Sequence, residues 1–160
     1  MILRPSFQFA FSHPAHFLSF GFGIGLVGFA PGTFGTLLAL PLYWYALREY
    51  PPGYALLIIG ALFAIGVWAC SITGRNLGVA DQGAMVWDEV VAFLLILLIA
   101  PEEPVWQAAA FFLFRAFDVV KPWPCRRLEM LPGGFGITLD DVMAGVYVNL
   151  LLQGARLIQG

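Results

Sequence analysis

The sequence FRAFDVVKPWPCRRLEMLPGGFGITLDD, residues 114–141, is the stretch around which this chain is organised. It concentrates charged side chains between two long apolar runs, residues 105–120 and 142–158. Polar groups flanked by so much apolar sequence are rarely placed without a role, so we expect the chemistry of the protein to take place in this stretch.

A polar stripe is expected at the start of this stretch. If residues 104–120 form one helix, then Arg115, Asp118 and Lys121 follow at i, i+3 and i+6 and share a face near its end. The prolines that come directly after the lysine then end the helix, because proline lacks a backbone donor and restricts the residue before it.

Composition indicates a bilayer protein. The chain has 160 residues, of which 60% are hydrophobic and 11% charged, and its mean hydropathy is +0.83. These values leave too few polar groups to cover the surface of a soluble domain. The length suits a single domain spanning residues 1–160, and a net charge of −2 gives no reason to expect a nucleic-acid partner.

Five apolar runs predict an all-α, compact, multi-pass membrane protein with about five membrane helices. Only the second and fifth runs approach the roughly 20 residues that cross the hydrocarbon core, and the others span only if their polar ends are included. Strands of a membrane barrel would alternate apolar and polar residues, which these runs do not. The runs are Thr36–Leu47, Tyr54–Ile72, Val90–Ala100, Val105–Val120 and Val142–Ile158.

The charges between the runs predict an orientation. If the runs alternate in direction, one side collects Arg4, Arg75, Lys121, Arg126 and Arg127, and the other collects Glu49, Glu102, Glu103, Arg48 and Arg156. The excess of basic residues marks the first side as cytoplasmic. The N-terminus is then cytoplasmic and the C-terminus lies on the opposite face.

Carboxylates converge on the same cytoplasmic side. The helix ends there carry Asp81, Asp88, Glu89, Asp118, Asp140 and Asp141. A charge placed deep in a bilayer costs about 2.5 to 3.5 kcal/mol on insertion scales, so this gathering calls for partners or a purpose. Neighbours on a helix point about 100° apart, so each acidic pair is expected to aim one carboxylate inward and one sideways. Oxygen ligands alone favour Mg²⁺ or a similar hard cation.

Structural explanations exist for each feature taken singly. Acidic residues near a helix start complement its dipole, residues 138–141 resemble a capping box, and Arg115 with Asp118 can be a local ion pair. Thr33 can cap the helix that follows it, or the start of that helix can bind a phosphate. The joint location of these groups with basic side chains favours a functional site.

Three other patterns carry no function. Residues 23–28 formally match a dinucleotide fingerprint, but no strand precedes them and no acidic residue follows before Glu49, so glycines for close helix packing are the better interpretation. Cys70 and Cys125 have neither metal-ligand nor disulfide spacing. The first 16 residues lack the pattern of a cleaved signal peptide.

Carboxylates mixed with arginine and lysine at a lipid surface suit phosphate ester chemistry. A metal held by the carboxylates would polarise the phosphoryl group or activate water, and the basic residues would bind its non-bridging oxygens. Hydrolysis of a phosphate ester is therefore the reaction that the residues favour.

Several motifs resemble the phosphatidylglycerophosphatase A family. They are Pro-Gly-Thr at residues 31–33, Val-Trp-Asp-Glu at 86–89, the Phe-Arg-x-x-Asp-x-x-Lys-Pro-Trp-Pro segment at 114–124, and Gly-Gly-Phe-Gly-Ile-x-x-Asp-Asp-x-x-Ala-Gly at 133–145. The resemblance covers roughly residues 14–155. It implies an all-helical, Mg²⁺-dependent enzyme that converts phosphatidylglycerophosphate to phosphatidylglycerol and phosphate at the cytoplasmic face of the bacterial inner membrane.

The resemblance also implies which residues form the site. The family's polar positions fall on Thr33, Asp81, Asp88, Glu89, Arg115, Asp118, Lys121, Asp140 and Asp141, with His16 also fitting the pattern. Our hypothesis is a metal held by Glu89, Asp118 and Asp141, with Asp88 as base or additional ligand. Arg115, Lys121 and the helix start at Thr33 would hold the phosphate.

Alternatives remain open at this point. A covalent aspartyl or threonyl phosphate would use the same residues as attack by water. A small carrier would place charges near mid-helix and show an internal repeat, and a structural membrane subunit would need no site at all. The sequence does not fix the oligomeric state, and a homo-oligomer is among the options.

Overall fold

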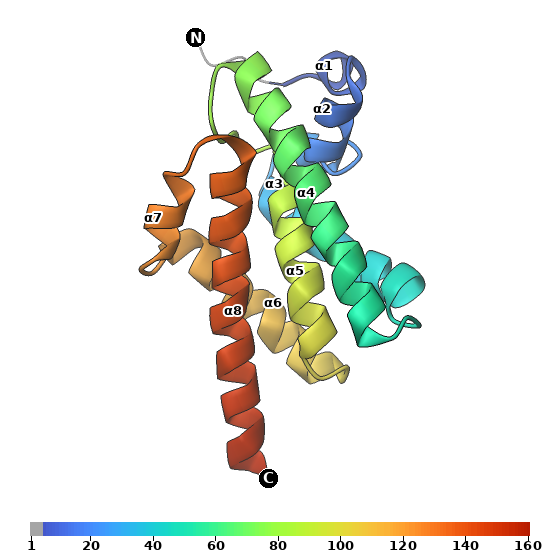
Figure 1. Ribbon diagram of the computed structural model, residues 1–160, viewed down its shortest axis with the longest axis vertical. Helices are drawn as coiled ribbons and strands as arrows, with labels where there is room; N and C mark the ends of the chain where they lie inside the picture. The colour runs from blue at the N-terminus through green and yellow to red at the C-terminus, as the bar shows by residue number, and fades with distance from the viewer. Residues whose placement is uncertain (1–4) are drawn as a thin grey trace.

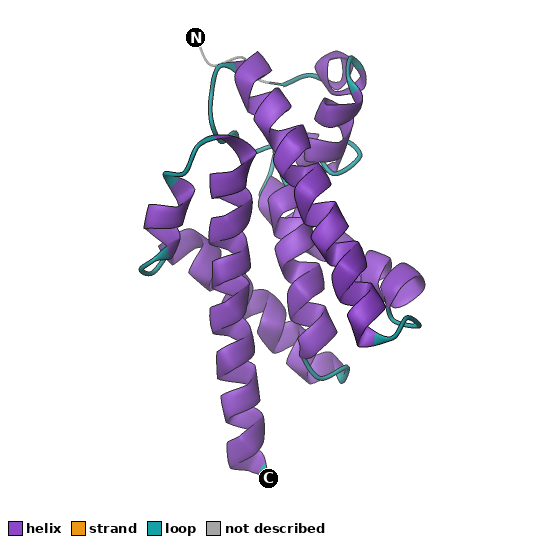
Figure 2. Ribbon diagram, in the orientation of Figure 1, coloured by secondary structure: helices purple, strands orange, loops and turns teal. Residues whose placement is uncertain are grey.

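The computed structural model describes residues 5–160, and within them it contains helices and loops but no strand (Figures 1 and 2). This confirms the all-α prediction. Each of the five apolar runs lies in a helix, and Arg4 lies outside the described residues. The longer elements are α3 (Pro31–Leu42), continued by the π-helical turn η2 (Tyr43–Leu47), α4 (Pro52–Leu77), α5 (Trp87–Ile99), α6 (Pro104–Val120) and α8 (Gly133–Gln159).

Four short helices complete the fold. They are α1 (Phe7–Phe11), α2 (Pro14–Ser19), the 3₁₀ turn η1 (Ile24–Leu26) and α7 (Cys125–Glu129). In Figure 1, α1 and α2 lie beside the C-terminal end of α4, and α7 lies beside the N-terminal half of α8. All four therefore gather near the end of the bundle where α5 and α8 begin.

Helix α5 is the centre of the bundle. It contacts α3, α4, α6 and α8, and most of its side chains are buried, among them Val90, Phe93, Leu94 and Ile96. A helix that is apolar all round is one that is buried all round. The apolar run at residues 90–100 therefore serves the protein interior.

Among residues 5–160, two helices are long and apolar enough to cross a membrane, α4 with 26 residues and α8 with 27. In the most apolar window of α4 only 28% of the residues are buried, so this helix turns an apolar surface outward. Helices α3, α5 and α6 have 12, 13 and 17 residues, and none of them meets that length and composition. The five-pass arrangement thus stays a prediction.

Helix α8 begins earlier than its charges suggest. It starts at Gly133, so the aspartate pair at 140–141 lies in its third turn. The side chain of Thr138 donates a hydrogen bond of 2.7 Å to the backbone oxygen of Gly134 instead of capping the helix. The capping-box interpretation is therefore wrong, because the glycines extend the helix by two turns on its N-terminal side.

Glycine explains that extension. Helices α4 and α8 cross so closely at Gly134 that a Cβ there would collide with the backbone oxygen of Val67 and lie 2.9 Å from Cys70 Cβ. The backbone N–H of Gly134 donates to Ser71 Oγ at 2.8 Å, which satisfies a helix-start donor that has no partner within α8. Small residues at such a crossing let helix backbones approach.

We predict that Gly134→Val lowers the thermal unfolding midpoint of the purified protein. Overpacking a tight contact typically costs about 1 to 3 kcal/mol, and here backbone atoms stand in the way. Gly154→Ala is the matched control on the same helix, since its Cβ would meet nothing within 4 Å. Equal midpoints for Gly134→Val and the unsubstituted protein would show that the crossing is not tight.

Candidate active site

Three carboxylates form a buried group at the meeting of α5 and α8. Asp88 and Glu89 come from the first turn of α5, and Asp141 comes from the third turn of α8. Each offers one oxygen, and these oxygens all lie within 4.8 Å of one another. The residues Asp88 and Asp141 are only 6% and 3% exposed, and the side chain of Glu89 is 12% exposed.

One oxygen of each of these carboxylates lacks a hydrogen-bond partner. The three atoms are Asp88 Oδ1, Glu89 Oε2 and Asp141 Oδ2. Buried charged oxygens are costly unless they are paired, hydrogen-bonded or bound to a metal. Three unsatisfied oxygens on three neighbouring carboxylates fit a hard divalent cation, for which oxygen is the preferred ligand.

The prediction that each acidic pair aims one carboxylate inward and one sideways holds for α8 but not for α5. In α8 the two aspartates diverge as expected, with Asp141 in the group and Asp140 directed to Lys121. In α5 both members of the pair belong to the group, because the longer side chain of Glu89 brings an oxygen back toward Asp88.

Arg115 and Asp118 lie beside the carboxylate group, on α6. Arg115 Nη1 donates a hydrogen bond of 2.6 Å to Asp118 Oδ2 and lies 3.7 Å from Glu89 Oε1. The expected i, i+3 pairing on one helix face is therefore confirmed. Asp118 is paired with the guanidinium and is not among the three clustered carboxylates, so its role as a metal ligand remains a prediction.

Lys121 does not join the pair formed by Arg115 and Asp118. It forms a second ion cluster with Glu129 and Asp140. It ends α6 with a left-handed backbone at φ +49°, and its Nζ donates to Glu129 Oε1 at 2.7 Å and Asp140 Oδ2 at 2.9 Å. Burial acts to lower the pKa of Lys121, but the two carboxylates outweigh it and raise the pKa above its ordinary value. The ammonium is thus held charged and ties the loop after α6 to α7 and α8.

The N-terminus of α3 closes the other side of the site. A Cβ at Gly32 would overlap Glu89 Oε1 and lie 3.0 Å from Arg115 Nη1, so only glycine lets the helix start come this close. The helix begins at Pro31 with Ala30 at the cap, which makes the interpretation of Thr33 as the cap wrong. Helix N-termini carry partial positive charge and suit anions.

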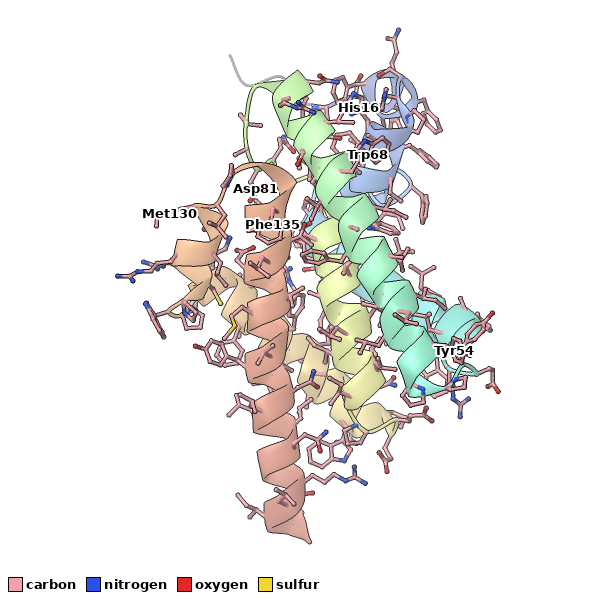
Figure 3. The ribbon with its side chains drawn as sticks, viewed as in Figure 1. His16, Tyr54, Trp68, Asp81, Met130 and Phe135 are labelled. Atoms are coloured by element: carbon pink, nitrogen blue, oxygen red, sulfur yellow. The ribbon has the colours of Figure 1, made fainter. Side chains whose placement is uncertain are left out.

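His16 and Asp81 are not part of the clustered carboxylates. Figure 3 shows His16 beside α4, where Asn76 Nδ2 lies 3.1 Å from its Nε2 and Thr73 Oγ1 lies 3.0 Å from its Nδ1. Burial, aided by His13, lowers the pKa of His16. Asp81 is an exposed residue of the loop between α4 and α5. We interpret His16 as a residue that joins α2 to α4.

Two residues of the site escaped the sequence reasoning. Gly32 is present in one of the motifs, but nothing in the sequence shows that its missing side chain makes room for Glu89 and Arg115. Glu129 is the partner of Lys121 across the turn made by residues 122–124. Its spacing of eight residues gives no periodic signal, because the chain reverses between the two.

Comparison with known proteins identifies the family of the chain. A family model described as phosphatidylglycerophosphatase A matches residues 17–156. The chain belongs to the phosphatidylglycerophosphatase A family. The resemblance drawn from the motifs is thereby confirmed, and with it the assignment of the chain to an enzyme family of phosphoric monoester hydrolases. No solved structure matches this chain.

Three relatives illustrate the family. The chain is 41% identical over 137 residues to phosphatidylglycerophosphatase A of Escherichia coli, covering 84% of this chain and 79% of that protein. It is 38% identical over 151 residues to the phosphatidylglycerophosphatase A of Haemophilus influenzae, covering 93% of both. A third relative, from Bacteroides thetaiotaomicron, has a name that proposes phosphatidylinositol-3-phosphatase activity, and it is 41% identical over 88% of this chain and 92% of that protein.

We predict that Mg²⁺ raises the unfolding temperature of the protein and that Asp141→Asn removes this response. A ligand present at 100 times its dissociation constant stabilises by about 2.7 kcal/mol. Without added metal, Asp141→Asn should unfold at a higher temperature than the unsubstituted protein, because it removes one of three clustered carboxylates that repel one another. The measurement is thermal unfolding in detergent with Mg²⁺ or with EDTA. A full Mg²⁺ response in Asp141→Asn would contradict the site.

Proposed function

We propose that this protein is a Mg²⁺-dependent lipid phosphatase that hydrolyses phosphatidylglycerophosphate to phosphatidylglycerol and phosphate at the cytoplasmic face of the bacterial inner membrane. The observation that carries the proposal is the set of three unpartnered carboxylate oxygens on Asp88, Glu89 and Asp141, placed beside a guanidinium and a helix N-terminus. Membership of the family supports the choice of substrate.

The phosphate would bind beside Arg115, on the side of the site where the guanidinium packs against the start of α3. The guanidinium is pinned through Nη1 to Asp118, and within residues 5–160 its Nε and Nη2 donate no hydrogen bond to the protein. Those two donors are free to grip a phosphate, which an arginine does in a bidentate manner. The N-terminal amides around Gly32 and Thr33 add partial positive charge on the same side.

Each carboxylate would have a distinct role. Asp88, Glu89 and Asp141 would hold the cation, which when bound supplies Lewis acidity toward the phosphoryl group. Asp118 would hold the guanidinium in position, and Lys121 would fix the loop after α6 through Glu129 and Asp140. Asp88 also remains the candidate for general base. Attack by water and attack by an aspartate or threonine both stay open.

Membrane contact is supported by the apolar surface of α4. Tyr54 is 64% exposed and Trp68 is 48% exposed. Figure 3 shows Tyr54 near the N-terminal end of α4 and Trp68 in its C-terminal half. They stand 14 residues apart, or about 21 Å along a helix rising 1.5 Å per residue. Tyrosine and tryptophan gather at the two interfaces of a bilayer. We propose that α4 and α8 cross the membrane, with the carboxylate group near its cytoplasmic side.

We expect Glu89→Gln to abolish Mg²⁺-dependent phosphate release, because the amide keeps the shape of the side chain but removes the charge that a hard cation needs. The loss should reach about 100-fold or more in turnover, as for other single losses of transition-state charge stabilisation. The assay is phosphate release from phosphatidylglycerophosphate in mixed micelles. Glu49→Gln, at the exposed turn before α4, is the matched control and should retain full activity.

Near-normal turnover of Glu89→Gln would remove this residue from the metal site. The same assay with phosphatidylinositol 3-phosphate tests the substrate that the name of the Bacteroides thetaiotaomicron relative suggests. Faster release from that lipid than from phosphatidylglycerophosphate would overturn the proposed substrate.

We expect Arg115→Lys to reduce turnover strongly while the apparent affinity for Mg²⁺ changes little. Lysine can still neutralise Asp118, but it cannot grip a phosphate through two parallel donors. Titrating Mg²⁺ at several lipid concentrations separates the two effects. If the lysine variant keeps most of its activity, Arg115 acts only as the ion-pair partner of Asp118.

A further inference from the structure

An apolar groove runs along one face of α5 at the surface of the bundle. A hollow of about 240 Å³ lies between α4, α5 and α8, and a second of about 260 Å³ lies between α5 and α8; Leu95 of α5 lines both, so they are neighbours. The floor of the groove is one face of α5, made by Val91, Leu95 and Ile99 at i, i+4 and i+8. Figure 1 shows α5 lying between α4 and α8 along this length.

The groove begins next to the candidate metal site. Asp88 precedes Val91 by three residues on α5, so it stands one turn above the floor on the same helix face. Val142, which lines the first hollow, follows Asp141 directly in α8. A molecule whose polar end lies at the carboxylates therefore has an apolar channel leading away from them.

The floor of the groove is deeper near the site than at its far end. Val91 is 1% exposed and Ile99 is 48% exposed, so the floor rises to the surface as it leaves the carboxylates. Along α8 the wall runs from Val142 to Gln153, which is 11 residues or about 16 Å of helix. This is the shape expected for a long, thin, apolar ligand that enters from the side.

Two residues keep the groove unfilled. A Cβ at Gly60, on the α4 wall, would meet nothing within 4 Å, so the wall has open space where another residue would place a side chain. Asn149 lines the second hollow, is only 8% exposed, and its Oδ1 has no hydrogen-bond partner. A buried amide oxygen without a hydrogen-bond partner costs stability, which indicates that the groove was not shaped for internal packing alone.

We propose that this groove binds one acyl chain of the lipid phosphate whose head group occupies the carboxylate site. The proposal rests on the proposed function, because it assigns the apolar half of the same substrate. The chain lies on Val91, Leu95 and Ile99, and the phosphate lies at the carboxylates, one helical turn beyond Val91. The acyl chain of the substrate and the metal site then both lie along α5.

The kinetic test uses a substitution on α4 whose side chain would occupy the groove. Gly60→Leu places a side chain in the open space, and Gly53→Leu is the matched control on the same helix, where a Cβ also meets nothing within 4 Å but lines neither hollow. For a long-chain lipid phosphate, kcat/KM of Gly60→Leu should fall about tenfold, as expected from displacing part of a buried chain. For a short-chain, water-soluble analogue it should stay within about twofold of the unsubstituted protein.

A second pair of variants shows whether a loss of activity comes from filling the groove or from misfolding. Val146→Trp fills the groove from α8, and Leu151→Trp places the same side chain on the outer surface of that helix. Selective loss of long-chain activity in Val146→Trp, but not in Leu151→Trp, supports the groove. Equal losses on long-chain and short-chain substrates in both groove variants, or no loss on either, would overturn it.

A binding readout separates this proposal from the proposed function. A phosphatidylglycerophosphate carrying a photoreactive group in its acyl chain should label the α5 segment around Leu95. Gly60→Leu should reduce that labelling severalfold, and the labelling is measured independently of turnover. The same photoreactive chain on phosphatidylcholine should label this segment much less. Labelling that is spread over all exposed apolar helices and insensitive to Gly60→Leu would contradict the groove even if the phosphatase activity is confirmed.

Discussion

Electrostatic repulsion among Asp88, Glu89 and Asp141 is the constraint on which the rest of the structure depends. Each carboxylate is buried, each leaves one oxygen without a hydrogen bond, and the three lie within 4.8 Å of one another. Like charges this close in a medium of low dielectric raise the free energy of the fold unless a cation is shared between them. The helices must therefore be anchored firmly enough to hold the three groups together.

The anchors are visible around the group. Glycine at 134 lets α8 cross α4 in close contact, which sets the position of Asp141, and glycine at 32 lets the start of α3 reach Glu89 and Arg115. The second ion cluster, in which Lys121 bonds Glu129 and Asp140, fastens the end of α6 to α7 and α8. The two neighbouring aspartates of α8 thus have different roles. Asp141 belongs to the carboxylate group, and Asp140 forms the ion pair with Lys121 that holds the helices together.

Much of this was predictable from the sequence. Apolar runs and prolines located the helices, and charge placement brought the carboxylates to one end of the bundle. The start of α8 was missed because glycines look like loop residues until a neighbouring helix gives them a packing partner. The pairing of Glu129 with Lys121 was not predicted, because the chain reverses direction between the two residues and no helical spacing connects them. Periodicity likewise could not tell that the apolar character of α5 serves the protein interior, since a buried core helix and a membrane helix look alike in composition.

The central claim is that these three carboxylates share one divalent cation. The most direct measurement is a crystal structure grown with Mn²⁺, in which anomalous scattering locates the ion without reference to activity. The account predicts a single peak bounded by oxygens of Asp88, Glu89 and Asp141, lost in Asp141→Asn crystals. A peak bound instead by Asp118 or Asp140, or no peak at Mn²⁺ concentrations that support phosphate release, would contradict it.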